Sequence, residues 1–174
     1  MEYDAIVYDL DGTLVHLAVD WESAHRDTVA ELRRAGITVD GEGLWALLDR
    51  SRDEGFRDII EGVLSDHERR GARTSERLSV ADELPRPEAV GVCSLNAESA
   101  CRIALDQHGL ESHVEAVVGR DTVDTYKPDP QPLLTTIASL SATPEETLFV
   151  GDTERDALTA ERAGVDFRFV GREL

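Results

Sequence analysis

Lysine is almost absent from this chain of 174 residues, in which Lys127 stands alone beside seventeen arginines. Positive charge is scarce altogether, since 36 acidic residues face 18 basic ones and the net charge is −18. Nucleic-acid binding requires a basic surface that neutralises phosphates, so this composition argues against that class of function. An acidic composition with almost no lysine suggests a halophilic host whose salt screens the mutual repulsion of the acids, and a GC-rich codon bias could also replace lysine by arginine.

Long apolar runs are also missing, and none approaches the roughly 18 residues that a membrane helix needs. The first residues lack the basic region and cleavage pattern of a secretory signal. We therefore expect a cytoplasmic protein with no membrane partner, either a monomer or a homodimer. Two cysteines, Cys93 and Cys101, are too few for a disulfide framework and are expected as free, buried thiols.

Hydrophobic periodicity predicts one strand, then a helical stretch, then alternating strands and helices. The first strand covers residues 3–8, and three helical stripes follow it without an intervening strand, the last ending before Gly71. Residues 72–87 are polar and contain prolines, which indicates a connector with room for one short helix. Strands are then expected at 89–93, 114–119, 147–151 and 167–170, and helices at 97–108, 130–140 and 154–163.

Strands separated by helices of this length indicate a parallel sheet built from right-handed crossovers. The predicted class is α/β, with a Rossmann-like, doubly wound parallel sheet. The connection from Asp9 to Ser94 is far longer than one crossover needs, so we expect a small all-α cap inserted after strand one. This assigns residues 1–15 and 80–174 to the core, and residues 16–79 to the cap and connector.

Chemically active residues gather where the predicted strands end, which is the edge at which parallel sheets bind ligands. DLDGT (residues 9–13) follows strand one, Ser94 follows strand two, Lys127 lies in the loop after strand three, and GDTERD (151–156) follows strand four. Acids this close repel one another unless a cation joins them. Hard oxygen ligands with room for water favour Mg²⁺. A solvated acidic face is the alternative, and the shared edge argues against it.

Two other motif interpretations are weaker. An EF-hand is excluded because Gly12 follows Asp11 directly, whereas that loop places its glycine at position six. Residues 41–46, GEGLWA, formally fit a dinucleotide fingerprint, but Glu42 stands where a pyrophosphate would approach. A helix N-terminus is the better interpretation of this segment.

The four motifs together resemble those of the haloacid dehalogenase-like hydrolase superfamily, over essentially the whole chain. DLDGT matches the first motif, Ser94 the second, Lys127 in its KPDP setting the third, and GDTERD the fourth. The resemblance is to the phosphatase branch with a small helical cap, similar to phosphoglycolate phosphatase. That subgroup usually continues the first motif with Asp-Ser, where this chain has Val15-His16-Leu17.

The resemblance implies a role for each motif residue. Asp9 would attack phosphorus, and Asp11 would protonate the leaving group and later deprotonate water. Mg²⁺ would be held by Asp9, Asp152 and the backbone carbonyl of Asp11. Ser94 and Lys127 would bind phosphoryl oxygens.

Four further residues receive supporting or alternative roles. Asp156 would orient Lys127 or a metal-bound water, and Thr13 would support the turn. His16 and Asn96 are candidate substrate contacts, with solvent exposure or a structural role as the alternative for His16 and helix capping for Asn96. Three cap arginines could bind a second substrate anion or simply balance the acidic surface: Arg50, Arg52 and Arg57.

The sequence therefore predicts a Mg²⁺-dependent phosphatase acting on a small phosphorylated metabolite. A dehalogenase would have no use for the acid Asp11, and a Schiff-base phosphonate hydrolase would need a second lysine. A phosphosugar phosphomutase and a non-enzymatic binding protein remain as alternatives. For Lys127→Arg we expect a loss of most activity with little change in folding.

Overall fold

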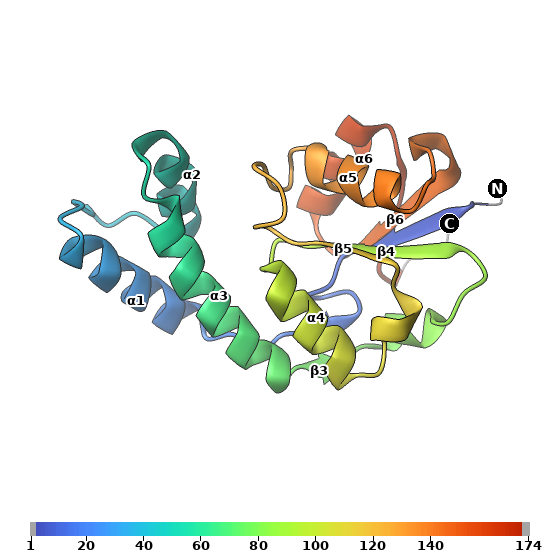
Figure 1. The fold of residues 1–174 in the computed structure, drawn as a ribbon, viewed down its shortest axis with the longest axis horizontal. Coiled ribbons are helices and arrows are strands. Elements are labelled where there is room, and N and C mark those ends of the chain that lie inside the picture. The colour runs from blue at the N-terminus through green and yellow to red at the C-terminus, as the bar shows by residue number, and fades with distance from the viewer. Residues whose placement is uncertain (1–2, 172–174) are drawn as a thin grey trace.

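Five parallel strands form the central sheet in the computed structural model, which describes residues 3–171 (Figure 1). The strand order is β5-β4-β1-β6-β7. Mostly apolar sequences with β-branched residues, such as AIVY and TLFVG, suit strands that are buried on both faces. The strands are β1 (Ala5–Tyr8), β4 (Ala89–Cys93), β5 (Ala116–Val118), β6 (Thr147–Gly151) and β7 (Asp166–Phe169).

Helices cover both faces of this sheet, which confirms the doubly wound α/β prediction (Figure 1). Helix α4 (Glu98–Gln107) packs on one face with the short 3₁₀ helix Ser79–Glu83. Helices α5 (Gln131–Ser139) and α6 (Glu154–Ala163) pack on the other. Two further 3₁₀ turns, Glu111–His113 and Pro144–Glu146, lie in connections.

A helical cap with its own apolar core is inserted between β1 and β4, as predicted. It contains α1 (Trp21–Arg34), α2 (Leu44–Glu54) and α3 (Arg57–Arg73). Helix α3 runs alongside α4 of the core and carries the main contact between the two parts (Figure 1). Helix α2 begins directly after Gly43, so the GEGLWA segment is a helix N-terminus.

The structure differs from the sequence prediction at several element ends and in one additional strand pair. The first strand starts at Ala5 rather than residue 3, and α3 continues through Gly71 to Arg73. Gly71 is needed for close packing, because a Cβ there would lie 2.9 Å from the backbone of Ala18. A two-stranded antiparallel ladder, β2 (Val15–His16) with β3 (Glu76–Arg77), was not predicted, and it joins the two ends of the cap insertion.

The two thiols behave as expected, since Cys93 and Cys101 are both free and buried. Within residues 3–171, no helix combines the length and apolarity required to cross a bilayer.

Candidate active site

Asp9 and Asp11 lie where β1 ends and the chain turns toward the cap. Asp9 is buried, with 6% of its surface exposed. The turn that follows requires Gly12, whose φ is +89°. A Cβ on Gly12 would lie 2.2 Å from Oδ2 of Asp152, so the missing side chain leaves the space that the Asp152 carboxylate occupies.

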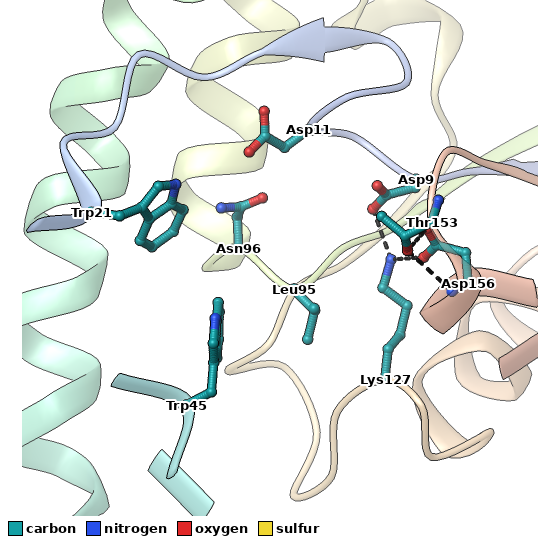
Figure 2. Close-up of a pocket in the computed structure, with 9 residues that line it drawn as sticks. All are labelled: Asp9, Asp11, Trp21, Trp45, Leu95, Asn96, Lys127, Thr153 and Asp156. Carbon is teal, nitrogen blue, oxygen red and sulfur yellow. Dashed lines mark hydrogen bonds and ion pairs between the residues drawn. The ribbon is translucent and has the colours of Figure 1, made fainter. Parts of the chain in front are cut away.

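Lys127 lies between two carboxylates. Its ammonium donates to Oδ1 of Asp9 at 2.8 Å and to Oδ1 of Asp156 at 2.5 Å (Figure 2). The lysine is only 2% exposed. Burial alone would lower the pKa of Lys127, but the charges of Asp9 and Asp156 outweigh it and raise that pKa. The single lysine therefore stays charged at the centre of the site.

Asp156 is fixed by the start of α6 as well as by Lys127. Thr153 and Asp156 form a reciprocal capping box, in which Oδ2 of Asp156 accepts from the backbone N–H of Thr153 at 3.1 Å. With Oδ1 and Oδ2 both engaged, Asp156 holds the ammonium in place. The Thr-x-x-Asp spacing in GDTERD is the sequence feature that indicates this cap.

One carboxylate oxygen from each of Asp9, Asp152 and Asp156 lies within 4.8 Å of the other two. Burial raises the pKa of Asp9 to about 7, an effect that the Lys127 charge opposes and the Asp156 charge adds to. Burial likewise raises the pKa of Asp152. Such a cluster of hard oxygen donors suits Mg²⁺. Because Asp156 is already engaged, Asp9 and Asp152 are the side chains best placed to hold the ion.

Asp11 points away from that cluster and toward the cap (Figure 2). Its Oδ1 accepts from the backbone N–H of Leu17 at 2.8 Å, and Nδ1 of His16 lies 3.6 Å from the same oxygen. Burial raises the pKa of Asp11, although the Leu17 hydrogen bond partly opposes this. A carboxyl group that retains its proton more readily is suited to work as a general acid.

Ser94 and Asn96 form a small network after β4. The Ser94 hydroxyl donates to Oδ1 of Asn96 at 3.0 Å and accepts from the Asn96 backbone N–H at 3.1 Å. Asn96 does not cap α4, because Ala97 holds the N-cap position and the N–H of Glu98, the first residue of the helix, donates to Oδ1 of Asp121 at 2.7 Å. The Thr13 hydroxyl is buried and has no hydrogen-bond partner among the described residues, so only its backbone takes part in the turn.

A cleft of about 120 Å³ opens between the cap and this edge of the sheet. Figure 2 shows the two tryptophans of the chain, Trp21 and Trp45, on the cap side of it. His16 is mostly exposed and is not among the lining residues, which are Asp9, Asp11, Trp21, Trp45, Leu95, Asn96, Lys127, Thr153 and Asp156. The tryptophans were not predicted as site residues, because only the packing of the cap brings them to the sheet edge.

The three cap arginines do not line the cleft. Arg50 binds Glu42 and the carbonyl of Thr38, and Arg57 binds the carbonyls of Arg120 and Asp124. Arg52 lies over the ring of Tyr126. These contacts hold Arg50, Arg52 and Arg57 outside the cleft, and only Arg52 among them is exposed.

The sequence analysis did not predict that Arg120 would be buried. Its guanidinium is fully buried and binds Glu61 at 2.9 Å and Glu68 at 2.5 Å, both on α3. The same guanidinium donates to the carbonyl of Leu95 at 2.8 Å, and Glu68 accepts from the N–H of Ala97 at 2.9 Å. The cap is thus tied directly to the loop that carries Ser94 and Asn96.

Comparison with known proteins agrees with this architecture. Residues 81–170 match the family described as haloacid dehalogenase-like hydrolase. The chain is similar to phosphoglycolate phosphatases of Cereibacter sphaeroides (33% identity, covering 93% of this chain and 82% of the relative) and Aquifex aeolicus (32%, covering 91% and 80%).

A solved structure from Geobacter sulfurreducens, a subfamily IA hydrolase of the same superfamily, aligns with a TM-score of 0.62 and 26% identity. The alignment covers 95% of this chain and 88% of that one, so it spans both the sheet and the cap. The motif order, the inserted helical cap and these similarities lead to one conclusion: the chain belongs to the haloacid dehalogenase-like hydrolase family, as a phosphoric monoester hydrolase similar to phosphoglycolate phosphatase.

Proposed function

We propose that the protein is a Mg²⁺-dependent phosphomonoesterase that forms an aspartyl-phosphate on Asp9. The observation that carries this proposal is the buried ammonium of Lys127, placed 2.8 Å from Asp9 with the Asp152 carboxylate close by. Lys127 donates to Oδ1 of Asp9, so Oδ2 is the oxygen that the ammonium does not bond. We assign this second oxygen as the nucleophile.

The chemistry proceeds in two displacements at phosphorus. Oδ2 of Asp9 forms a bond to phosphorus while the bond to the leaving oxygen breaks, and Asp11 gives its proton to that oxygen. Water then attacks the aspartyl-phosphate, and Asp11 takes the proton of that water. Inorganic phosphate departs and the Asp9 carboxylate is restored. The raised pKa of Asp11 supports a protonated Asp11 side chain at the start of the reaction.

The phosphate group of the substrate is a dianion and needs cations and hydrogen-bond donors around it. We assign these roles to Lys127, Ser94 and the metal ligands. The Lys127 ammonium and the Ser94 hydroxyl are the groups proposed to hold phosphoryl oxygens. The carboxylates of Asp9 and Asp152 and the backbone carbonyl of Asp11 would hold Mg²⁺. When bound, Mg²⁺ offsets the repulsion between the Asp9 carboxylate and the phosphate.

Hydrolysis fits the cleft better than a phosphomutase reaction does. A mutase requires a cap residue that manages a proton or clamps the sugar during phosphoryl return. The cap side chains that line the cleft are Trp21 and Trp45, and an indole takes no proton. A binding protein without catalysis would not need a paired nucleophile and ammonium beside an acid. Phosphoglycolate is the first monoester to test, because the curated relatives carry that name.

The test is a phosphate-release panel in molar KCl, with and without Mg²⁺, on the wild type and Asp9→Asn. We expect Mg²⁺-dependent release by the wild type and at least about a thousandfold loss in Asp9→Asn, because the covalent step is removed. Asp53→Asn, which changes an exposed aspartate of α2, serves as the matched control. Release from no monoester, or full activity in Asp9→Asn, would contradict the proposal.

A further inference from the structure

The loop between β5 and α5, residues 119–130, carries Lys127 to the edge of the site. Figure 1 shows this loop extending from the sheet toward helices α2 and α3 of the cap. Near the end of the loop, the Lys127 ammonium donates to Asp9 at 2.8 Å and to Asp156 at 2.5 Å. The same loop therefore approaches the cap and supplies the buried ammonium.

Tyr126, the residue directly before Lys127, lies outside the cap insertion in the sequence but packs with the cap in the structure. Its ring lies against the apolar core of the cap, whose other members all fall within residues 21–64. Its hydroxyl donates to the carboxylate of Asp49 on α2. The cap thus holds the side chain next to Lys127 through both the ring and the hydroxyl.

Two cap arginines complete this contact. The guanidinium carbons of Arg52 and Arg57 lie 5.7 and 5.8 Å from the centroid of the Tyr126 ring, a distance at which a cation is attracted to an aromatic face. Arg57 also donates to the backbone carbonyl of Asp124 at 2.7 Å and to that of Arg120 at 3.0 Å. The backbone of the loop is therefore held by the cap as well.

The chain on the other side of Lys127 is held by the core. Arg162 of α6 donates to the carbonyl of Pro128 at 2.9 Å. The backbone N–H of Asp129 donates to the carbonyl of Tyr126 at 3.0 Å and closes the turn around the lysine. Lys127 thus lies between a segment anchored to the cap and a segment anchored to the core.

A contact that only stabilised the cap would not need this position. Helix α3 already packs along α4 and provides the main contact between cap and core. The contacts of Tyr126 are made instead one residue before the ammonium that must meet Asp9. Placement there is demanding, because an error of about 1 Å in the position of a reacting group can cost about a hundredfold in rate.

We propose that Tyr126 is a positioning residue: the cap holds its side chain and thereby fixes the Lys127 ammonium beside Asp9. Tyr126 does not line the cleft and acts through its neighbour. Its effect on catalysis rests on the proposed function, in which Lys127 binds a phosphoryl oxygen. The cap then does more than cover the cleft, since it sets the position of a reactive group that the core carries.

The position of the ammonium can be followed without turnover. Lys127 is the only lysine of the chain, so labelling lysine with ¹⁵N at Nζ gives a single side-chain ammonium signal in NMR spectra. In Tyr126→Ala and in Asp49→Ala, we expect a changed chemical shift and exchange of the ammonium protons with water at least about tenfold faster than in the wild type. Asp49 is exposed, so its variant should fold. An unchanged signal in both variants would overturn the proposal.

Tyr3 provides a matched control for this experiment. Its hydroxyl also donates to an aspartate, Asp166, at 2.9 Å, and it lies before the start of β1, at the end of the strand away from the site. Tyr3→Ala should leave the ammonium signal as it is in the wild type. An equal change in Tyr3→Ala and Tyr126→Ala would mean that general destabilisation moves the ammonium, and it would also overturn the proposal.

Kinetics separate positioning from stabilisation. Tyr126→Ala should lower kcat for phosphate release by at least about tenfold and change KM by less than about twofold, while Tyr126→Phe, which keeps the ring against the cap, should recover most of the loss. Adding Asp49→Ala to Tyr126→Phe should lower kcat by less than about twofold more, because both changes remove the same hydrogen bond. A lower unfolding temperature with wild-type kcat in Tyr126→Ala, or a rise in KM alone, would contradict positioning.

Failure of the phosphatase mechanism gives a different result. Full turnover by Asp9→Asn would contradict the proposed chemistry and leave the ammonium signals of the Tyr126 variants as predicted. Mg²⁺-dependent phosphate release that is lost in Asp9→Asn, together with an ammonium signal that no Tyr126 variant changes, would contradict the role of Tyr126 alone.

Discussion

At the scale of single residues, Lys127 links Asp9 at the end of β1 to the start of α6. Its ammonium bridges Asp9 and Asp156 inside a site where only 2% of the lysine is exposed. A compact ammonium fits between two carboxylates and a phosphoryl oxygen. A guanidinium is wider and planar, and it imposes a fork of donors on its partners.

Lys127→Arg should therefore lose at least about a hundredfold in kcat, since the two carboxylates and the phosphate are displaced. The burial of Lys127 also revises the expectation of unchanged folding: inserting a larger group into this space should cost about 1–3 kcal/mol. Phosphate release and urea unfolding measure the two effects. Turnover at the wild-type rate would mean that the lone lysine is a consequence of composition.

Asp9 should lower the folding stability of the metal-free protein as the pH rises. Burial raises its pKa from 3.8 in the unfolded chain to about 7 in the fold. The folded state thus binds the proton more tightly, so this contribution to stability is full below pH 3.8 and is lost as the pH rises to 7.

Asparagine carries no charge, so Asp9→Asn removes this loss of stability at high pH. Without Mg²⁺, the variant should unfold at a higher temperature than the wild type at pH 8. The difference between their unfolding temperatures should be smaller at pH 5. Each kcal/mol corresponds to about 2–4 °C for a chain of this size. Thermal unfolding of both proteins, with Asp53→Asn as the surface control, measures the difference. Equal midpoints at pH 8 would contradict a raised pKa of Asp9 in the folded protein.

Residues at strand ends were predictable, and residues placed by packing were not. Asp9, Lys127, Asp152 and Asp156 follow from strand positions in the sequence, and the structure brings them together at one edge. Nothing in the sequence distinguishes Arg120 from the sixteen other arginines, because its burial arises only when α3 packs against the loop after β5. The roles of the predicted residues stay predictions until activity is measured.

At the scale of elements, Arg120 ties α3 to the loop after β4. Removing it as Arg120→Leu leaves Glu68 buried without its charge partner, which should cost about 3–5 kcal/mol. Adding Glu68→Leu should recover part of that loss. Urea unfolding measures both variants, and Arg102→Leu, at a half-exposed pair with Glu98, should cost less than about 1 kcal/mol. An equal loss of unfolding free energy in Arg120→Leu and Arg102→Leu would contradict a stabilising link between α3 and the loop after β4.

Helices and strands were predicted correctly where the hydrophobic periodicity extends over enough residues to be recognised. Helix α6 was predicted at its observed bounds because ten residues and a capping box define it. Strands β2 and β3 have two residues each, too few to show any alternation. Gly71 was taken as a helix end because its contact with Ala18 is tertiary and leaves no local pattern.

At the scale of the whole molecule, a net charge of −18 opposes folding at low salt. The Debye length falls from about 10 Å at 0.1 M to about 3 Å at 1 M, so added KCl should raise the unfolding midpoint by several degrees over this range. NaCl should give the same curve if screening is the cause. A midpoint that stays flat or falls between 0.1 and 1 M would contradict this expectation.

The central place of β1 in the sheet has a consequence for how the chain folds. Ala5 pairs with Ala89 on one side and with Thr147 on the other, so the first strand made pairs with strands that are made much later. The cap helices, which depend on nearer contacts, can form while β1 is still unpaired. Closing such long loops is slow. Until β4 and β6 arrive, the apolar segment AIVY remains exposed, and this is the stage at which the chain is most prone to aggregate.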